Sequence, residues 1–140
     1  MLKLMVFAII LTTLLSCERN TPLIKYEPKS SQEQALKSVL LHFQDAVTNK
    51  DSKKVLSLIH EKASIMIGTD PKLLSKTEYA EILPERLAEN SYIALGKPQI
   101  TVSGDKAEIK IYMTRADDNF LMTFNMKLED NNWYILSWGY

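Results

Sequence analysis

The chain has 140 residues, one cysteine, and equal numbers of basic and acidic side chains, 17 of each. A nucleic-acid-binding protein usually carries a basic patch or stripe, and this sequence shows none, so we expect no nucleic-acid partner. The lone cysteine excludes an internal disulfide. About 110 residues remain after the first 30, which is an ordinary size for one domain.

The first residues have the pattern of an export signal. Lys3 supplies a positive charge, and Leu4–Leu15 is a run of twelve residues with no charge, Gly or Pro. A bilayer-spanning helix needs about 20 apolar residues, so this run is too short to be a stable anchor. A charged start, a short apolar core and a small residue at the end are typical of a secretory signal peptide. We predict that residues 1–16 form one.

The end of this leader, Leu14-Leu15-Ser16-Cys17, resembles the lipobox of bacterial lipoproteins. Leu14, Ser16 and Cys17 match the motif, whereas Leu15 stands where a smaller or β-branched residue is usual. The resemblance implies cleavage between Ser16 and Cys17 and acyl chains, such as palmitate, on Cys17. Two or more chains hold a protein durably on a membrane. The alternative is an ordinary signal peptide followed by an incidental cysteine.

The residue after the cysteine indicates which membrane a lipoprotein is attached to. In the lipoprotein family, the inner-membrane retention signal usually has Asp there, and this chain has Glu18. The resemblance therefore implies the outer membrane, facing the periplasm, or the cell surface where the source has one membrane.

Residues 17–30 are predicted to be a linker that follows the lipidated cysteine. They are polar, contain two prolines and have little periodicity. At about 3.1 Å per residue when extended, the 13 residues after Cys17 would hold the domain ~40 Å from the lipid. Leu23, Ile24 and Tyr26 are apolar enough to dock on the domain instead.

A helix is predicted over residues 31–49. Ser30 and Glu33 have the spacing of a capping box, and apolar residues from Leu36 to Val47 recur at helical spacing. Asp51 or Ser52 would cap a second, shorter helix that ends near His60.

A short strand at Ala63–Ile67 and a loop at 69–75 are expected to follow. A third helix is predicted over 77–90, disturbed at Pro84 because proline removes a hydrogen bond and clashes with the preceding turn.

Four alternating segments predict a β-meander, at 91–103, 106–115, 118–129 and 133–138. Two-residue turns at Gly104-Asp105, Ala116-Asp117 and Asn131-Asn132 would place one apolar set on a single face, since opposed residues in an antiparallel pair share a face. A one-residue slip at any turn would scatter this set. The set is Ile100, Val102, Ala107, Ile109, Ile111, Met113, Phe120, Met122, Phe124, Met126, Leu128, Trp133 and Ile135.

The helices should cover that apolar face, which makes the fold class α+β. The other face is mostly polar, with an apolar group near its end formed by Tyr112, Leu121, Leu136, Trp138 and Tyr140. Such a group is seldom left in water. Either the linker covers it, or it is an interface with a protein partner or a second copy of the chain.

The order of these elements resembles the nuclear transport factor 2-like, or cystatin-like, superfamily. Ala46–Val55 resembles its helix–turn–helix, Leu58–Ile67 its entry into the first strand, and Asn131–Ser137 its closing strand with a characteristic Trp. The likeness spans residues 31–140. It implies helices packed on one face of a curved antiparallel sheet, a four-stranded meander plus a short first strand, enclosing a cone-shaped pocket.

Members of this superfamily include isomerases, dehydratases and cyclases as well as binding proteins, so the fold alone cannot choose a function. An isomerase of this fold needs a phenol on the first helix and a carboxylate base on the first strand. Alignment on Asp51 puts these positions at Phe43 and Ile67, and neither side chain can do that chemistry.

The histidines are the remaining weak catalytic candidates. His42 or His60 could form a dyad with Asp45 or Asp70 in the pocket, although a boundary histidine satisfied by solvent or backbone is the commoner case. Two histidines without CxxC, HxH or HExxH spacing do not predict a metal site. No Gly-rich phosphate loop exists, so no cofactor is expected.

The residues expected to line the pocket are apolar or aromatic: Phe43, Tyr79, Tyr92, Ile111 and Phe124. We therefore expect a lipid-anchored envelope protein whose domain binds a protein partner or a small apolar ligand without catalysis. The alternative is a small dehydratase, cyclase or isomerase that uses a His–carboxylate pair in the cone.

Overall fold

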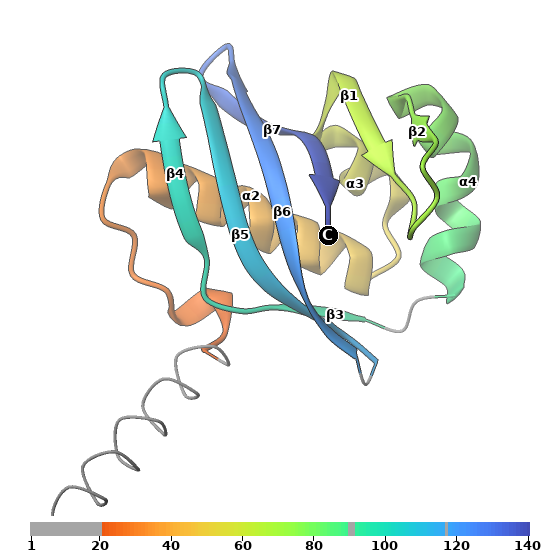
Figure 1. The fold of residues 1–140 in the computed structure, drawn as a ribbon, viewed down its shortest axis with the longest axis horizontal. Helices are drawn as coiled ribbons and strands as arrows, with labels where there is room; N and C mark the ends of the chain where they lie inside the picture. The colour runs from red at the N-terminus through yellow and green to blue at the C-terminus, as the bar shows by residue number, and fades with distance from the viewer. Residues whose placement is uncertain (1–20, 90–91, 117) are drawn as a thin grey trace, which may run out of the picture.

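A computed structural model of the chain describes residues 21–89, 92–116 and 118–140, and the predicted signal peptide and Cys17 lie outside these ranges. The fold is α+β, as predicted, with the helices packed on one face of a curved sheet (Figure 1). In chain order the elements are η1 (Leu23–Lys25), α2 (Ser31–Thr48), α3 (Ser52–Ser57), β1 (Ile59–Met66), β2 (Leu73–Leu74), α4 (Lys76–Glu89), β3 (Ile93–Leu95), β4 (Gln99–Ser103), β5 (Lys106–Arg115), β6 (Asp118–Glu129) and β7 (Asn132–Gly139).

The sheet is mixed rather than wholly antiparallel. Its strand order is β2-β1-β7-β6-β5-β3, with β4 also paired to β5. β1 runs parallel to β7, and all other pairs are antiparallel. The backbone N–H of Ile135 donates to the carbonyl of Leu58 at 2.8 Å, which joins the end of α3 to β7. The predicted strand at 91–103 is two strands, β3 and β4, that share the long strand β5 as partner.

Side chains cap the helices where the spacing predicts it. The Ser30 hydroxyl accepts from the Glu33 backbone N–H at 3.1 Å, and the Asp51 carboxylate accepts from Lys54 N–H at 3.0 Å. A complete capping box that the sequence analysis did not identify starts α4, where Ser75 and Glu78 each accept from the other's backbone N–H.

The second helix is shorter than predicted, because Ile59 and His60 belong to β1. Ile59 lies at a helical interval from Val55 but pairs instead with Ile135 of β7.

The first two predicted turns are confirmed. Val102 faces Ala107, and Ile109 faces both Ile100 and Phe124. Nine of the thirteen residues predicted to share the inner face are buried, and the other four pack against the core: Ile100, Val102, Phe120 and Leu128.

The third turn differs from the prediction. It lies at Asp130-Asn131, with φ of 50° and 62°, so Leu128 faces Trp133 rather than Ile135. This shift of two residues leaves the inner set unchanged. Further along, the register slips by one residue between Asn125 and Met126.

That slip is a β-bulge, and it moves Trp138 to the inner face. Met126 faces Ile135, Phe124 faces Trp138, and the extra residue on β7 is Leu136. The prediction that Trp138 lies on the outer face is therefore wrong, because the alternation of faces along β7 reverses at the bulge.

Much of the predicted linker is docked on the domain. Leu23 in η1 is only 1% exposed. The buried Lys37 ammonium of α2 donates to the carbonyls of Ile24 at 2.9 Å and Tyr26 at 2.6 Å. The Tyr26 hydroxyl and the Lys29 backbone N–H both donate to Glu33, at 2.7 Å and 2.9 Å. The residues from Thr21 onward are thus held against α2 instead of extending away from it.

Among the residues described, no helix has the length and apolar character needed to cross a membrane.

Candidate functional site

A cavity of about 90 Å³ opens between helices α2 and α4 and the concave face of the sheet. Its walls come from seven separate elements, the turn after β1 and the residue after β7, so it is assembled only when the whole domain has folded. It is lined by Phe43, Val47, Met66, Ile67, Gly68, Tyr79, Leu83, Arg86, Leu87, Ile93, Met113, Arg115, Phe120, Met122, Trp138 and Tyr140.

Trp138 forms the centre of an aromatic wall. Its ring lies 5.7 Å from Phe43 and 5.5 Å from Tyr79, in tilted and edge-on arrangements that aromatic pairs favour. Its indole N–H donates to the carbonyl of Met66 at 3.0 Å, which fixes the ring between β1 and β7. The bulge in β7 places Trp138 on the inner face, because without the bulge this side chain would lie on the outer face of the sheet.

One face of α4 supplies the opposite wall. Tyr79, Leu83 and Leu87 recur every four residues, and Arg86 lies on the same side. Tyr79 is 7% exposed, and burial raises its pKa to about 12, although the nearby positive charge of Arg86 acts in the other direction. Its hydroxyl has no hydrogen-bond partner among the described residues, and the phenol remains protonated at neutral pH.

Arg115, at the end of β5, is the second basic group of the cavity. Its guanidinium lies 5.9 Å from the centre of the Phe120 ring, within the range of a cation–π contact. Arg86 and Arg115 are both half-buried. Neither makes an ion pair with a carboxylate in the part of the chain that the structure describes.

The two positions aligned with isomerase catalytic residues both face this cavity. Phe43 and Ile67 both line it, although only Phe43 was expected to do so. A phenyl ring and a branched alkyl group cannot stabilise an enolate or abstract a proton. At these two positions the cavity therefore lacks the groups that the resemblance would require of an isomerase.

Two of the five residues predicted to line the pocket do so, Phe43 and Tyr79. Ile111 and Phe124 are fully buried behind the wall, where Phe124 packs edge-on against Phe43 at 5.7 Å. Tyr92 is 46% exposed and lies outside the lining. Strand alternation predicts which side chains face inward. It does not distinguish the side chains that line the cavity from those that are buried beneath the lining.

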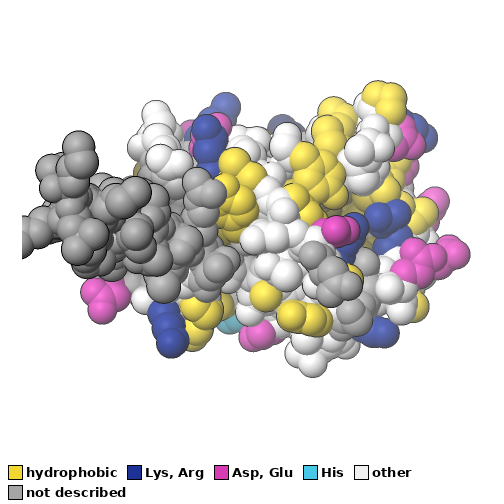
Figure 2. All heavy atoms as spheres, turned by 60° about the horizontal axis from the view of Figure 1, so that its bottom comes forward, with side chains coloured by type: hydrophobic (Ala, Val, Ile, Leu, Met, Phe, Trp, Pro, Cys, Tyr) yellow, Lys and Arg dark blue, Asp and Glu magenta, His cyan; other side chains and the backbone are white. Residues whose placement is uncertain are grey.

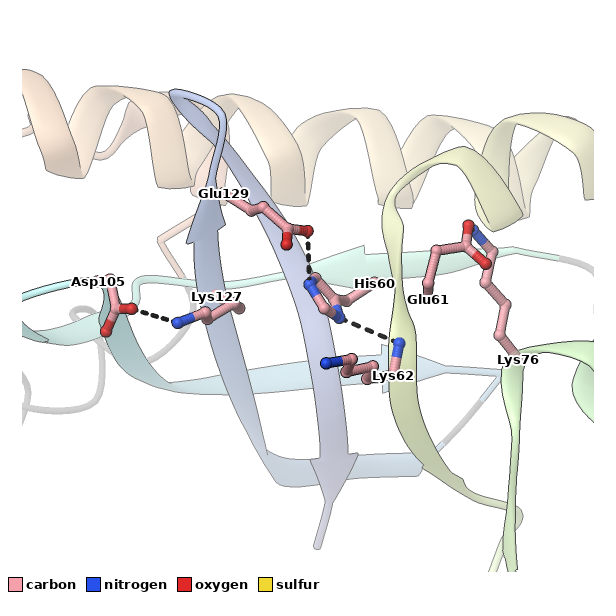
Figure 3. Close-up of polar contacts among 7 residues, drawn as sticks. All are labelled: His60, Glu61, Lys62, Lys76, Asp105, Lys127 and Glu129. Carbon is pink, nitrogen blue, oxygen red and sulfur yellow. Dashed lines mark hydrogen bonds and ion pairs between the residues drawn. The ribbon is translucent and has the colours of Figure 1, made fainter.

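Neither histidine lies in the cavity. His42 is exposed on α2, as is Asp45. His60 is buried on β1, and Figure 3 shows its ring between Glu129 and the backbone of Lys62. The dyad of His60 with Asp45 or Asp70, which the sequence left as an alternative, does not form, because the carboxylate partner of His60 is Glu129, at 2.8 Å, in a separate surface pocket.

Both ring nitrogens of His60 are occupied. Nδ1 accepts from the Lys62 backbone N–H at 3.1 Å, which requires Nε2 to carry the proton and donate to Glu129. A general base needs a free nitrogen lone pair aimed at a substrate. The geometry therefore indicates that the pair joins β1 to the end of β6 and that His60 is not a base.

The residues predicted as an outer interface do not form one patch. Tyr112 and Leu121 face each other across β5 and β6, and Leu121 is 45% exposed. Leu136 lies at the bulge, whereas Trp138 lies inside and Tyr140 packs on Phe120 at 5.2 Å at the rim of the cavity.

No group of three or more His, Cys, Asp or Glu residues within residues 21–89, 92–116 and 118–140 could hold a metal ion.

Solved structures with the same architecture define the class of protein. The chain is similar to an NTF2-like (nuclear transport factor 2-like) protein from Cytophaga hutchinsonii, with 14% identity, a TM-score of 0.68, and 78% of this chain and 96% of the other covered. The predicted nuclear transport factor 2-like fold is thereby confirmed. The chain belongs to the family described as Putative lumazine-binding, whose model matches residues 31–140.

Two further structures show how varied the names within this fold are. A putative ketosteroid isomerase from Shewanella frigidimarina has 22% identity and a TM-score of 0.64, covering 75% of this chain and 94% of the other. A putative calcium/calmodulin dependent protein kinase II association domain from Xanthomonas campestris has 11% identity and a TM-score of 0.69, covering 86% and 92%. No curated protein matches the chain.

The basic groups of the site, Arg86 and Arg115, were not predicted from the sequence. Arg86 is seven residues after Tyr79 and therefore on the same face of α4. That spacing is visible in the sequence, but nothing distinguishes Arg86 from other exposed helix residues until the position of α4 in the fold is known. Arg115 precedes a turn, where charged residues are ordinary, and only the curvature of β5 and β6 brings it to the cavity.

Proposed function

We propose that this chain is a lipid-anchored protein of the cell envelope whose domain binds a small, largely apolar ligand in the cavity without catalysing its reaction. The observation that carries the ligand-binding proposal is the cavity itself. Phe43 and Ile67 stand where an isomerase has its acid and base, and Trp138, Tyr79 and Phe120 add aromatic surface around them.

The walls suit a flat, apolar molecule. Aromatic rings offer faces and edges for stacking, and Met66, Met113 and Met122 are side chains whose flexibility lets a wall adapt to its occupant. The family description points to lumazine, a planar bicyclic heterocycle, as the first compound to test. A cavity of about 90 Å³ would have to widen for it, which the methionines and the half-exposed rim residues allow.

A titration of the purified chain with lumazine, followed by tryptophan quenching, tests this function. Trp138 lines the cavity, so a bound ligand should quench it. Ile67→Trp places bulk at the half-buried rim and should abolish binding. Leu73→Trp, at an exposed position outside the lining, is the matched control and should bind as the unaltered chain does. Absence of saturable quenching, or equal binding by both variants, would contradict the proposal.

The membrane attachment is supported by the lipobox-like Leu14-Leu15-Ser16-Cys17. Only Glu18, Arg19 and Asn20 separate Cys17 from the docked residues, so the lipid would lie at most ~14 Å of chain from Thr21. This replaces the ~40 Å tether expected from an extended linker. Mass spectrometry of the N-terminal peptide should find acyl chains on Cys17, and Cys17→Ser should release the protein from the membrane fraction.

A second candidate function is self-association through the outer face of the sheet. Tyr112 and Leu121 lie side by side there with Leu121 largely in water, and one similar structure is named an association domain. Sedimentation of the unaltered chain should then show a dimer that Leu121→Glu converts to a monomer. A monomer at all concentrations would exclude this candidate.

A further inference from the structure

Two arginines line an apolar cavity, and no ion pair joins either of them to a carboxylate among the residues that the structure describes. Arg86 projects from α4 and Arg115 from the end of β5, and both contribute to the lining. Asp118 faces Arg115 across the hairpin in register, yet no ion pair joins them, and the Arg115 guanidinium lies over Phe120 instead. Figure 2 looks at the molecule from the lower side of Figure 1 and shows basic, acidic and hydrophobic side chains next to one another on that face.

The Tyr79 hydroxyl is a third polar group at the cavity, and it is open to solvent, because no fully buried side-chain oxygen or nitrogen of the described residues lacks a partner. The side chain is more than nine-tenths buried and lines the cavity, and no described residue hydrogen-bonds its hydroxyl. Burial keeps the phenol protonated, so it can donate a hydrogen bond at neutral pH. Among the side chains that line the cavity, Arg86, Arg115 and Tyr79 can thus donate hydrogen bonds to a ligand, and none of the lining side chains is a carboxylate or an amide.

An organic acid complements this arrangement. A guanidinium presents a planar fork of donors that matches a carboxylate, and such charge-assisted bonds are stronger than neutral ones. Half-buried cations have lost part of their hydration, so an anion that reaches them recovers interaction energy that water no longer supplies. The aromatic and methionine walls would at the same time cover an apolar body.

We propose that the cavity binds a carboxylic acid with a flat apolar body, the body against Trp138 and Phe43 and the carboxylate on Arg86 and Arg115, with Tyr79 as an additional donor. This inference rests on the proposed function, since it names the ligand class for the same cavity. It also assigns the two arginines as the residues that determine specificity between an acid and its neutral counterpart.

The test compares 2-naphthoate with 2-naphthamide, which share one body and differ in charge. Calorimetric titration of the full chain should show the acid binding about tenfold to a hundredfold more tightly than the amide, the range expected for hydrogen bonds to charged groups. Arg86→Gln and Arg115→Gln should each weaken naphthoate about tenfold or more and leave naphthamide within about twofold. Lys72→Gln, a cation outside the cavity, is the matched control and should change neither.

Retained binding of naphthamide shows in each variant that the cavity has folded. Arg115→Lys keeps the positive charge but loses the planar fork of donors. Its affinity for 2-naphthoate should therefore lie between that of the unaltered chain and that of Arg115→Gln. Equal affinity for acid and amide, unchanged by either glutamine variant, would overturn the inference while leaving the apolar cavity as a binding site. Failure of lumazine, acid and amide alike to bind would instead remove the proposed function on which it rests.

Discussion

The docking of the N-terminal segment can be tested with two neighbouring residues of η1. Leu23 is 1% exposed and Ile24 is 63% exposed, although both are branched aliphatic residues in the same short helix. Replacement of a buried leucine by alanine typically costs about 2–5 kcal/mol. Here the lower part of that range is expected, because the segment can detach and full burial of a leucine contributes about 1.5–3 kcal/mol.

We therefore expect Leu23→Ala to lower the free energy of unfolding by about 2–3 kcal/mol, and Ile24→Ala by less than about 0.5 kcal/mol. Urea unfolding followed by tryptophan fluorescence measures both. With a slope near 1.5 kcal/mol per M, the Leu23→Ala midpoint should fall by about 1–2 M.

A Leu23→Ala midpoint no lower than that of Ile24→Ala would refute the reasoning, and with it the replacement of the long tether by a docked segment. Lys37→Met probes the same docking independently. It removes the donor to the carbonyls of Ile24 and Tyr26, at an expected cost of about 1–3 kcal/mol.

Three further predictions concern other parts of the domain. His60→Ala should lower the melting temperature, since it leaves Glu129 without its partner and opens a void, but it should not change lumazine affinity because His60 lies outside the cavity. Gly104→Ala should cost about 1 kcal/mol in urea unfolding through backbone strain alone, because φ is +60° and no heavy atom beyond the two neighbouring residues lies within 4 Å of the added methyl group. A loss above about 3 kcal/mol would point to a steric clash instead. The pKa of Glu33 is lowered from 4.5 by the backbone N–H of Lys29 and then by the Tyr26 hydroxyl, so its stabilisation is present above pH 4.5 and is lost as pH falls through the folded pKa. Between about pH 6 and about pH 2.5, Glu33→Gln should therefore lose less stability than the unaltered chain, and parallel losses would contradict that assignment.

The register of the meander was largely predictable because its turns and its apolar alternation agree. Gly104-Asp105 and Ala116-Asp117 each leave the inner set on one face. The third turn keeps the inner set on one face whether it lies at Asp130-Asn131 or at Asn131-Asn132, because the two registers differ by two residues. The choice between them depends on which residues adopt positive φ, and Asp and Asn tolerate it almost equally well.

The bulge in β7 could not be predicted from the alternation of β7 alone. It is stabilised by contacts that form only in the complete fold, where Trp138 packs on Phe43 and Tyr79 and donates to Met66. The same holds for Ile59, whose helical spacing from Val55 is overridden by pairing with Ile135 of β7. Local pattern therefore predicted the fold and the position of the cavity, whereas the composition of its walls depended on long-range packing.

The docked N-terminal segment also affects how the domain would meet its ligand. If Cys17 carries lipid, a linker of at most ~14 Å confines the domain to a thin layer at the membrane surface. A ligand that partitions into the headgroup region would meet the cavity far more often than one dissolved in the surrounding fluid. Such a domain samples the membrane in two dimensions and would compete poorly for molecules that never approach it.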